Sequence, residues 1–298
     1  MPKFKALIIG YGSIGRKHHE ILKKIKKIDE IFIFTSQKNI KKSINKLSDI
    51  KIINPDFIII SSTTNTHYKY LNFINSNFIN KKILVEKPLF INLHKIDKIK
   101  NNIFVGYNLR LHPIIRFIKN WAKNKKILSA DIYCGSYLPN WRNRPLQKTS
   151  SYDKKINGGI IYELSHEIDY ARFIFGPLKK LFVSKKKLST IKMKDNDYSQ
   201  IIFKTKKGSI ISIKLNYYSY IRKRFIIIDS PKESLFANLI TGEIVTQSNT
   251  KKKIKKFKYN IDNTYKEQMT LLIKEKFKNL CSYNEGFETL KTIRNLNI

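Results

Sequence analysis

Short apolar runs alternate with amphipathic segments along the N-terminal part of the chain. The segment from Ile14 to Ile25 places its apolar residues at helical spacing on one side and lysines on the other. The apolar runs lack in/out alternation, which is typical of strands covered on both faces. This pattern predicts strand–helix–strand units that build a doubly wound parallel sheet, with strands at Phe4 to Ile9, Ile31 to Phe34, Phe57 to Ser61, Ile83 to Glu86 and Ile103 to Tyr107.

After about residue 120 the pattern changes to short strands joined by tight links. The link Lys206-Lys207-Gly208 is too short for a crossover helix and favours antiparallel pairing. Residues 251–258 are expected to form a Lys-rich loop or strand edge. Helices are predicted at Ile160 to Phe175, Tyr265 to Leu280 and Gly286 to Leu296, and strands from Leu181 and at Asp197 to Thr205, Ser209 to Tyr217, Phe225 to Asp229 and Ser234 to Leu239.

The predicted fold class is therefore α/β, with two domains. Residues 1–120 are expected to form a Rossmann domain with a doubly wound parallel sheet. Residues 121–298 are expected to form an α+β domain with a mainly antiparallel sheet.

The chain carries 59 Lys and Arg residues against 22 Asp and Glu, a formal net charge of +37. Clustered cations bind nucleic acid by releasing counterions from its phosphates. Here the lysines are spread over the whole chain, together with many Ile and Asn residues. A general bias toward lysine at surface positions is the favoured interpretation, and a basic nucleic-acid-binding protein is the less favoured one.

Two cysteines, Cys134 and Cys281, lie far apart in the sequence and outside any metal-ligand spacing. Neither a disulfide framework nor a metal site is expected. The N-terminus enters an apolar strand with no signal-peptide pattern, and no apolar run approaches the roughly 18 residues that a membrane span needs. A cytoplasmic protein without a membrane partner is expected.

A glycine-rich turn directly follows the first predicted strand and opens the first helix. In such a turn the first glycine permits a sharp bend, the second lets a pyrophosphate approach the backbone, and the third allows close helix–strand packing. Free N–H groups at the helix N-terminus attract an anion. We therefore predict a dinucleotide site that includes Gly10, Gly12, Ser13, Ile14 and Gly15.

The second predicted strand ends in Phe34-Thr35-Ser36-Gln37-Lys38. A site that selects NAD usually has an Asp or Glu there to bind the ribose hydroxyls, and this stretch holds no carboxylate. Hydroxyl groups with Lys38 and Arg16 nearby suit a 2′-phosphate. The cofactor is predicted to be NAD or NADP, with NADP at least as well supported and with Thr35 and Ser36 among its contacts.

Polar motifs also follow the next three predicted strands. The carboxyl ends of parallel strands form the edge where open α/β sheets bind ligands. Cofactor contacts are therefore expected from Ser62, Thr63, Asn65, His67, Glu86, Lys87 and Asn108. The second half adds Gly158-Gly159 and Leu164-Ser165-His166-Glu167-Ile168-Asp169.

This ordered series resembles the glucose-fructose oxidoreductase / inositol dehydrogenase / rhizopine-catabolism (Gfo/Idh/MocA) family over nearly the whole chain. The resemblance implies an NAD(P)-dependent oxidoreductase that acts on sugars or cyclitols. It implies a C-terminal domain that binds substrate and often forms the oligomer interface, so a homodimer or homotetramer is expected. Lys87 of the Glu-Lys-Pro triplet and His166 after the Gly-Gly would be the catalytic pair. The motif around His166 also looks like that of members linked to surface-polysaccharide sugars.

The chemistry of these two side chains agrees with that role. Oxidation of a secondary alcohol needs a base for the hydroxyl proton while hydride leaves the carbon, and an imidazole such as His166 is such a base near neutral pH. A lysine ammonium such as Lys87 stabilises the developing alkoxide. The bond between Lys87 and Pro88 is a candidate for the cis form.

The chain also departs from the family pattern. Many members have an Asp four residues before the catalytic His, where this chain has Tyr162. Glu163 lies three residues before His166 and would share a helix face with it, so Glu163 is predicted to orient the imidazole or assist proton transfer. Thr63 stands where proline is frequent. These departures leave open a non-catalytic dinucleotide-binding protein of the same fold.

A loop rich in aromatic and cationic residues precedes the Gly-Gly. Trp141 would stack on a sugar ring, and Arg142 or Arg144 would bind a carboxylate or phosphate through two bonds. The alternative is that such arginines belong to the general cationic surface. The predicted substrate contacts are Arg110, Trp141, Arg142, Tyr152 and Asp169.

Overall fold

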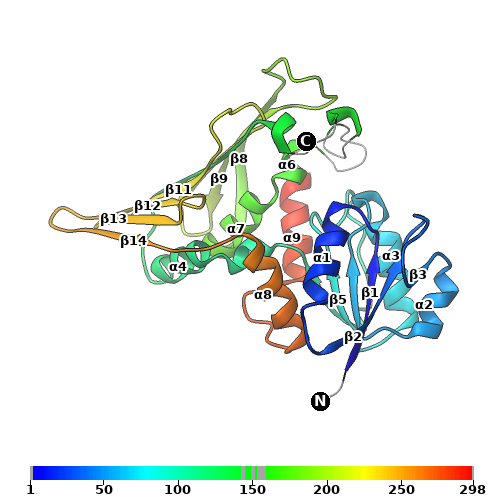
Figure 1. Cartoon of the computed structure of the whole chain (residues 1–298). Coiled ribbons are helices and arrows are strands. Elements are labelled where there is room, and N and C mark those ends of the chain that lie inside the picture. The colour runs from blue at the N-terminus through cyan, green and yellow to red at the C-terminus, as the bar shows by residue number, and fades with distance from the viewer. Residues whose placement is uncertain (1–2, 142–144, 149–151, 153–158, 297–298) are drawn as a thin grey trace. The chain divides into compact units, whose positions relative to one another are not determined.

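The computed structural model describes residues 3–141, 145–148, 152 and 159–296 of the chain (Figure 1). The chain divides into two compact units. The first unit contains Met1–Asn108 and Ile261–Leu290, and the second unit contains Leu109–Asn260 and Lys291–Ile298. The sequence placed everything after residue 120 in the second domain. The structure differs because helix α8 (Asp262–Ile273) packs on α1 (Ser13–Leu22) and strand β15 (Cys281–Ser282) pairs with β6 (Asn102–Val105).

The first unit is built on a seven-stranded sheet with the order β15-β6-β5-β4-β1-β2-β3. All neighbouring strands are parallel except β15. The central strands are buried almost throughout, because both faces of the sheet are covered. The predicted Rossmann sheet is confirmed, with β1 at Phe4–Ile9, β2 at Ile28–Phe34, β3 at Ser43–Ile44, β4 at Phe57–Ile60 and β5 at Lys82–Val85.

Helices lie on both faces of this sheet, with α1 on one side and α2 (Leu47–Ile53) and α3 (His67–Asn77) on the other (Figure 1). The glycine turn ends at the first residues of α1. The connection from β5 to β6 consists of turns and irregular backbone, so this crossover has no α-helix. The helix predicted from Ile14 to Ile25 begins one residue earlier and ends at Leu22.

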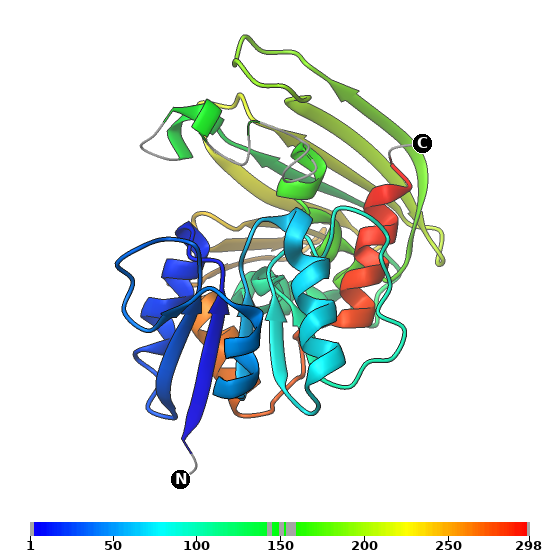
Figure 2. The ribbon, with the colours of Figure 1, turned by 90° about the vertical axis from the view of Figure 1, so that its right-hand side faces the viewer.

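The second unit contains an eight-stranded sheet with the order β14-β13-β12-β11-β7-β10-β9-β8. Its strands lie side by side in the green to yellow part of Figure 2. All neighbours are antiparallel except β7 (Ser129–Gly135) and β10 (Ile210–Asn216), which confirms a mainly antiparallel sheet. The sequence prediction missed β7, although it is a central strand. The other strands are β8 at Leu178–Lys186, β9 at Tyr198–Thr205, β11 at Lys223–Asp229, β12 at Ser234–Asn238, β13 at Glu243–Gln247 and β14 at Lys252–Lys256.

Burial alternates along these strands, as in β9, where every second side chain is buried. One face of the sheet is therefore a core face. Helices α6 (Ile160–Glu163) and α7 (His166–Phe175) pack on it, and α4 (Pro113–Ala122) packs on α7. The Lys-rich stretch near residue 251 becomes the exposed edge strand β14.

Three predicted helices have different bounds in the structure. The helix expected from Ile160 to Phe175 is two helices, because Leu164 leaves helical geometry at φ −96° and ψ 34°. The helix expected from Tyr265 to Leu280 is α8 and ends at Ile273. The last helix, α9, spans Tyr283–Arg294. Among the described residues no helix has both the length and the apolar surface that would let it traverse a lipid bilayer.

Candidate active site

In the first unit, the carboxyl ends of the long parallel strands are aligned at one edge of the sheet. The register pairs Ile9 with Phe34 and Ile60, and Ile60 with Val85, which pairs with Val105. The next residue of each strand therefore occupies the same edge. A ladder of backbone bonds links these residues, from Gly10 N to Phe34 O, Ser61 N to Ile9 O, Glu86 N to Ile60 O and Gly106 N to Val85 O. The predicted cofactor motifs are thus brought together in one row.

The glycine turn leaves an open cradle at this edge. Gly10 has φ +92°, and a Cβ on it would lie 2.5 Å from the backbone of Ser62. A Cβ on Gly15 would lie 2.2 Å from Gly10 O, so close helix–strand packing requires that glycine. A Cβ on Gly12 would meet nothing within 4 Å among the described residues. The turn is closely packed at Gly10 and Gly15 and open at Gly12, at the N-terminus of α1. This open side fits the pyrophosphate of a dinucleotide.

The end of β2 is connected to the glycine turn through Gln37, which the sequence prediction left out of the site. Its Nε2 donates to Tyr11 O over 3.0 Å, and its Oε1 accepts from Arg16 Nη2 over 2.8 Å. The Arg16 guanidinium also lies 4.6 Å from the centre of the Tyr11 ring. Thr35 Oγ1 accepts from Gln37 N over 3.2 Å, whereas Ser36 is exposed. This end of the strand presents hydroxyl and cationic groups without a carboxylate.

The loop after β4 is folded onto the glycine turn. Ser61 Oγ donates to Gly10 O over 2.9 Å, and Thr66 Oγ1 donates to Ser62 Oγ over 2.7 Å. Thr63 precedes the short 3₁₀ helix at Thr64–Thr66 and Asn65 lies within it, and both side chains are exposed. Their predicted contact with the cofactor remains a prediction.

His67 begins α3 and is buried, with 1% of its surface exposed. Its Nε2 lies 3.1 Å from Ser62 O, and its Nδ1 lies 3.2 Å from both Pro88 O and Leu89 O. Burial lowers the pKa of His67 below its ordinary value, against the opposing effect of these carbonyl groups. The ring therefore holds the loop after β4 to the loop after β5.

Lys87 follows β5 and is partly buried, and the bond between Lys87 and Pro88 is cis. Glu86 is 7% exposed, and its Oε1 lies 2.6 Å from Nε2 of His18 on α1. Its Oε2 accepts from Lys87 N over 3.2 Å. The sequence prediction missed His18. His18 lies on the buried side of α1, together with Gly15 and Leu22. This position could have indicated that His18 needs a buried hydrogen-bond partner.

Asn108 is also buried, at 2% exposure, in the first unit. Its Nδ2 donates to Thr264 Oγ1 of α8 over 2.6 Å. Its Oδ1 has no hydrogen-bond partner among the described residues. The amide is therefore anchored at one end and has an acceptor left over, and its cofactor role remains a prediction.

In the second unit, His166 is the first residue of α7. Glu163 is the last residue of α6, so the continuous helix that would have put both side chains on one face is interrupted at Leu164. The helical-spacing argument for Glu163 was therefore wrong, whereas its proposed part in proton transfer remains a prediction. Tyr162, at the position of the family's usual Asp, is 2% exposed.

Two buried carboxylates hold the first turn of α7. Asp169 accepts from Arg110 Nε over 2.9 Å and from Arg110 Nη2 over 2.8 Å. Glu167 Oε1 accepts from Arg224 Nε over 2.7 Å and lies 2.6 Å from Arg224 Nη2. Acidic groups at a helix N-terminus also suit the helix dipole. These pairs fix the helix that carries His166, and a substrate role for Arg110 or Asp169 remains a prediction.

Of the remaining predicted substrate contacts, Trp141 is the last residue of the 3₁₀ helix at Leu138–Trp141. Trp141 Nε1 donates to Ser136 Oγ over 2.9 Å, and its ring meets Tyr217 edge-on at 5.5 Å. Tyr152 lies with its ring 5.7 Å from Lys194 Nζ. Arg142 and Arg144 lie outside the described residues.

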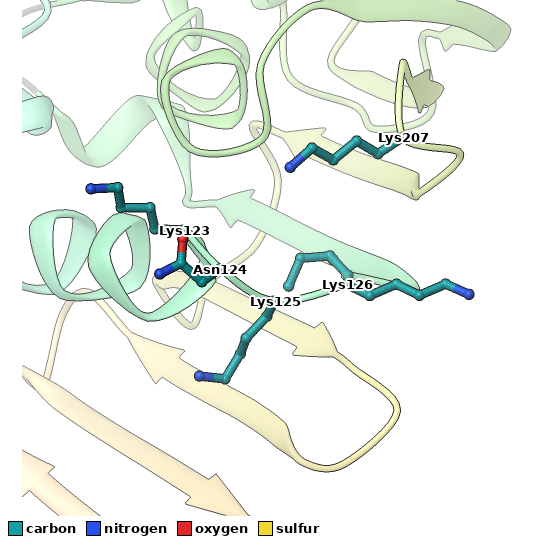
Figure 3. Close-up of a pocket in the computed structure, with 6 residues that line it drawn as sticks. Lys123, Asn124, Lys125, Lys126 and Lys207 are labelled. Atoms are coloured by element: carbon teal, nitrogen blue, oxygen red, sulfur yellow. The ribbon is translucent and has the colours of Figure 1, made fainter.

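A hollow of about 470 Å³ in the second unit lies between the end of α4 and the β9–β10 turn (Figure 3). Figure 3 shows its lysine side chains pointing in different directions, and Lys125 is 3.4 Å from Glu233. No predicted site residue lines it. The described residues contain no group of His, Cys, Asp and Glu suited to a metal ion. The lining residues are Lys123, Asn124, Lys125, Lys126, Ile127 and Lys207.

Two protein-family models match the chain, one in each unit. Residues 4–103 match the oxidoreductase family with an NAD-binding Rossmann fold, and residues 126–230 match the GFO/IDH/MocA C-terminal domain. The two matches together cover more than half of the chain. The chain belongs to the Gfo/Idh/MocA family. It is therefore an oxidoreductase with the NAD-binding Rossmann domain of that family.

Solved structures of an oxidoreductase and of two dehydrogenases share the fold at low sequence identity. Levoglucosan dehydrogenase in complex with NADH has a TM-score of 0.83 at 14% identity, covering 99% of this chain and 96% of that chain. UDP-N-acetylglucosamine 3-dehydrogenase from Acidithiobacillus ferrooxidans has a TM-score of 0.81 at 12% identity, covering 100% of this chain and 97% of that chain. An oxidoreductase from Agrobacterium radiobacter, in complex with NAD⁺, L-tartaric acid and magnesium, has a TM-score of 0.82 at 15% identity, covering 98% of this chain and 94% of that chain. No curated protein sequence matches the chain.

Proposed function

We propose that this oxidoreductase transfers hydride between NAD or NADP and a hydroxyl or keto carbon of a sugar, cyclitol or sugar derivative. The observation that carries the proposal is the row at the sheet edge of the first unit, where the glycine cradle and the Glu86-Lys87-Pro88 turn occupy the same level. The names of two neighbours, a levoglucosan dehydrogenase and a UDP-N-acetylglucosamine 3-dehydrogenase, support a sugar-like substrate.

Each unit supplies its own part of the proposed chemistry. The glycine turn and the N-terminus of α1 bind the pyrophosphate, and the bound nicotinamide supplies the hydride chemistry. Lys87 places a positive charge where an alkoxide develops. His166 accepts the hydroxyl proton during oxidation and returns it during reduction. Glu163 assists this proton transfer.

A first experiment measures cofactor binding before chemistry. The purified chain is titrated with NADH and with NADPH by fluorescence at moderate salt. It is then mixed with each nucleotide and a panel of sugars, cyclitols and nucleotide sugars. Lys87→Ala and His166→Ala are expected to bind nucleotide yet lose turnover by about a hundredfold or more. Lys69→Ala, a change of an exposed lysine on α3, is the control and should keep full activity.

The outcomes separate the candidate functions. Saturable nucleotide binding with turnover that depends on Lys87 and His166 supports the proposal. Saturable binding without turnover of any compound supports a non-catalytic dinucleotide-binding protein, the alternative that Tyr162 at the position of the usual Asp favours. A parallel titration with DNA tests whether the net charge of +37 serves to bind nucleic acid. Affinity for DNA that falls steeply with salt, with no nucleotide binding, would overturn the proposal.

A further inference from the structure

A buried histidine connects the nucleotide-binding helix with the turn that carries Lys87. His18 is on α1, three residues after Gly15, and none of its surface is exposed. Its Nε2 lies 2.6 Å from Oε1 of Glu86, and its ring meets Tyr265 edge-on at 5.8 Å. All five of these residues belong to the first unit. The predicted site did not include this histidine.

The surroundings of the two His18 ring nitrogens indicate which group donates the hydrogen bond to the other, His18 or Glu86. Its Nδ1 is buried and has no partner among the described residues. A proton on Nδ1 would leave a buried donor unsatisfied, which costs more than an unused lone pair. The tautomer that fits carries its proton on Nε2 and donates to the Glu86 carboxylate. A bond to an ionised acceptor is shorter and stronger than one between neutral groups.

The other oxygen of Glu86 acts on the lysine turn. Glu86 Oε2 accepts from the backbone N–H of Lys87 over 3.2 Å. On its other side the carboxylate meets Gly106, where an added Cβ would come within 2.9 Å of Oε2. His18 on one side and Gly106 on the other leave the carboxylate little room to shift. The backbone of Lys87 is therefore held through Glu86 by a side chain of α1.

Two other buried histidines show how this contact differs from ordinary core packing. The ring nitrogens of His67 lie near the carbonyl groups of Ser62, Pro88 and Leu89, and His112 accepts from Ile114 N at the start of α4. Both rings bond to backbone groups: His67 joins the loops after β4 and β5, and His112 caps the start of α4. His18 instead bonds to a carboxylate 68 positions away in the sequence, which itself holds the residue beside it.

We propose that His18 is a positioning residue for Lys87, which it holds in place through the Glu86 carboxylate. The contact couples the first turns of α1, at the cofactor cradle, to the position of the lysine ammonium. This inference rests on the proposed function for its effect on catalysis. Its structural part, that His18 restrains Lys87, stands independently of any substrate.

The test compares two replacements of His18. His18→Gln keeps an N–H donor near the position of Nε2, and His18→Leu removes the donor at similar volume. Asn75→Ala is the control for general destabilisation of the first unit, because Asn75 makes buried bonds to Lys98 O and Lys100 N away from the lysine turn. Three quantities are measured for each full-length variant: the Kd for the preferred nucleotide, kcat, and the rate at which Lys87 is modified.

The modification rate is measured by reductive methylation with peptide-resolved mass spectrometry. We expect His18→Leu to lower kcat about tenfold with little change in nucleotide Kd, as for the loss of a bond to a charged group. We expect Lys87 to be methylated about threefold faster in His18→Leu, because the turn opens more easily. His18→Gln should restore most of both values, and Asn75→Ala should change neither.

The readouts separate failure of this inference from failure of the proposed function. If wild-type chain turns over no sugar but Lys87 still reacts faster in His18→Leu, the positioning role holds and the proposed function fails. If wild type is active but His18→Leu changes kcat and Lys87 labelling no more than Asn75→Ala does, the positioning role is overturned. Should His18→Leu not fold, Glu86→Gln replaces it, since it weakens the same bond at equal size.

Discussion

Arg110 and Asp169 form a two-bonded ion pair, with 2.9 Å from Nε to Oδ2 and 2.8 Å from Nη2 to Oδ1. Only 2% of either side chain is exposed. The pair joins the 3₁₀ helix at Asn108–Leu111 to the first turn of α7, just after His166. A planar guanidinium bound in this way fixes orientation as well as distance. The predicted catalytic histidine therefore begins a helix whose N-terminal turn is locked in place.

Removal of one partner of this pair should destabilise the second unit strongly. Asp169→Ala leaves a buried guanidinium without its carboxylate, and we expect a loss of about 3–5 kcal/mol in the free energy of unfolding. Urea unfolding followed by tryptophan fluorescence measures it, because both tryptophans, Trp121 and Trp141, lie in this unit.

Glu233→Ala is the matched control, since it breaks the partly exposed pair between Lys125 and Glu233 in the same unit. A pair of this kind contributes about 1 kcal/mol or less. An Asp169→Ala variant as stable as Glu233→Ala would contradict the structural role assigned to the buried pair.

Gly12 offers a test of the cofactor cradle that leaves the fold intact. A Cβ there meets nothing within 4 Å among the described residues, so Gly12→Ala should keep the thermal midpoint of the wild type. The methyl group would instead occupy the space that a pyrophosphate approaches, and we expect NADH affinity to fall about tenfold or more. Fluorescence titration and thermal unfolding measure the two effects separately.

Gly10→Ala is the companion variant. Its φ of +92° and a Cβ 2.5 Å from the Ser62 backbone strain the folded chain itself. This variant should lose stability and nucleotide binding together. Unchanged NADH affinity in Gly12→Ala would show that the open side of the turn is not the nucleotide site.

The sequence predicted the parts of the fold that depend on periodicity and local turn chemistry. The parallel strands were predictable because each is a compact apolar run, and the glycine turn because its residues are required by backbone geometry. The break at Leu164 was not, because Ile160 to Phe175 reads as one apolar helical pattern. Strand β7 was missed although it pairs on both sides, because its seven residues include Ser129, Asp131 and Gly135 and form no continuous apolar run.

For the candidate site, too, the sequence predicted local motifs but not contacts between distant residues. Sequence motifs placed Gly10, Ser61 and Glu86 at strand ends, and the register shows them in one row. Pairs between distant residues, such as His18 with Glu86, follow from tertiary packing, and the position of His18 on the buried side of α1 does not tell which residue is its partner. Arg110 and Asp169 were predicted as substrate contacts because they are polar groups within motifs, and the structure pairs them with each other.

The end of β2 makes a prediction about cofactor preference. Thr35, Ser36 and nearby Arg16 present hydroxyl and cationic groups where an NAD-selecting site has a carboxylate. We expect the wild type to bind NADPH at least as tightly as NADH. Ser36→Asp should weaken NADPH binding about tenfold or more by repelling the 2′-phosphate, with little loss for NADH. Ser36→Asn is the uncharged control, and equal effects of both variants would argue against a phosphate contact.

His112 makes a prediction about pH and stability. It is 3% exposed at the start of α4, where Nδ1 accepts from Ile114 N over 3.2 Å. Burial, with a smaller effect of the Arg224 charge, lowers the pKa of His112 from 6.5 to about 4. The folded chain therefore keeps this ring neutral at a pH where the unfolded chain protonates it. Stability from this group is complete above pH 6.5 and is lost as the pH falls toward 4.

Comparison with His112→Asn isolates this contribution. Asparagine keeps a capping acceptor for Ile114 N but does not titrate, and every other ionisable group, including buried His67, stays the same in both proteins. Between about pH 7 and about pH 5, the wild type should lose about 2 kcal/mol more unfolding free energy than His112→Asn. Urea unfolding at both pH values measures the difference. Parallel losses in the two proteins would mean that His112 titrates equally in the folded and unfolded chains.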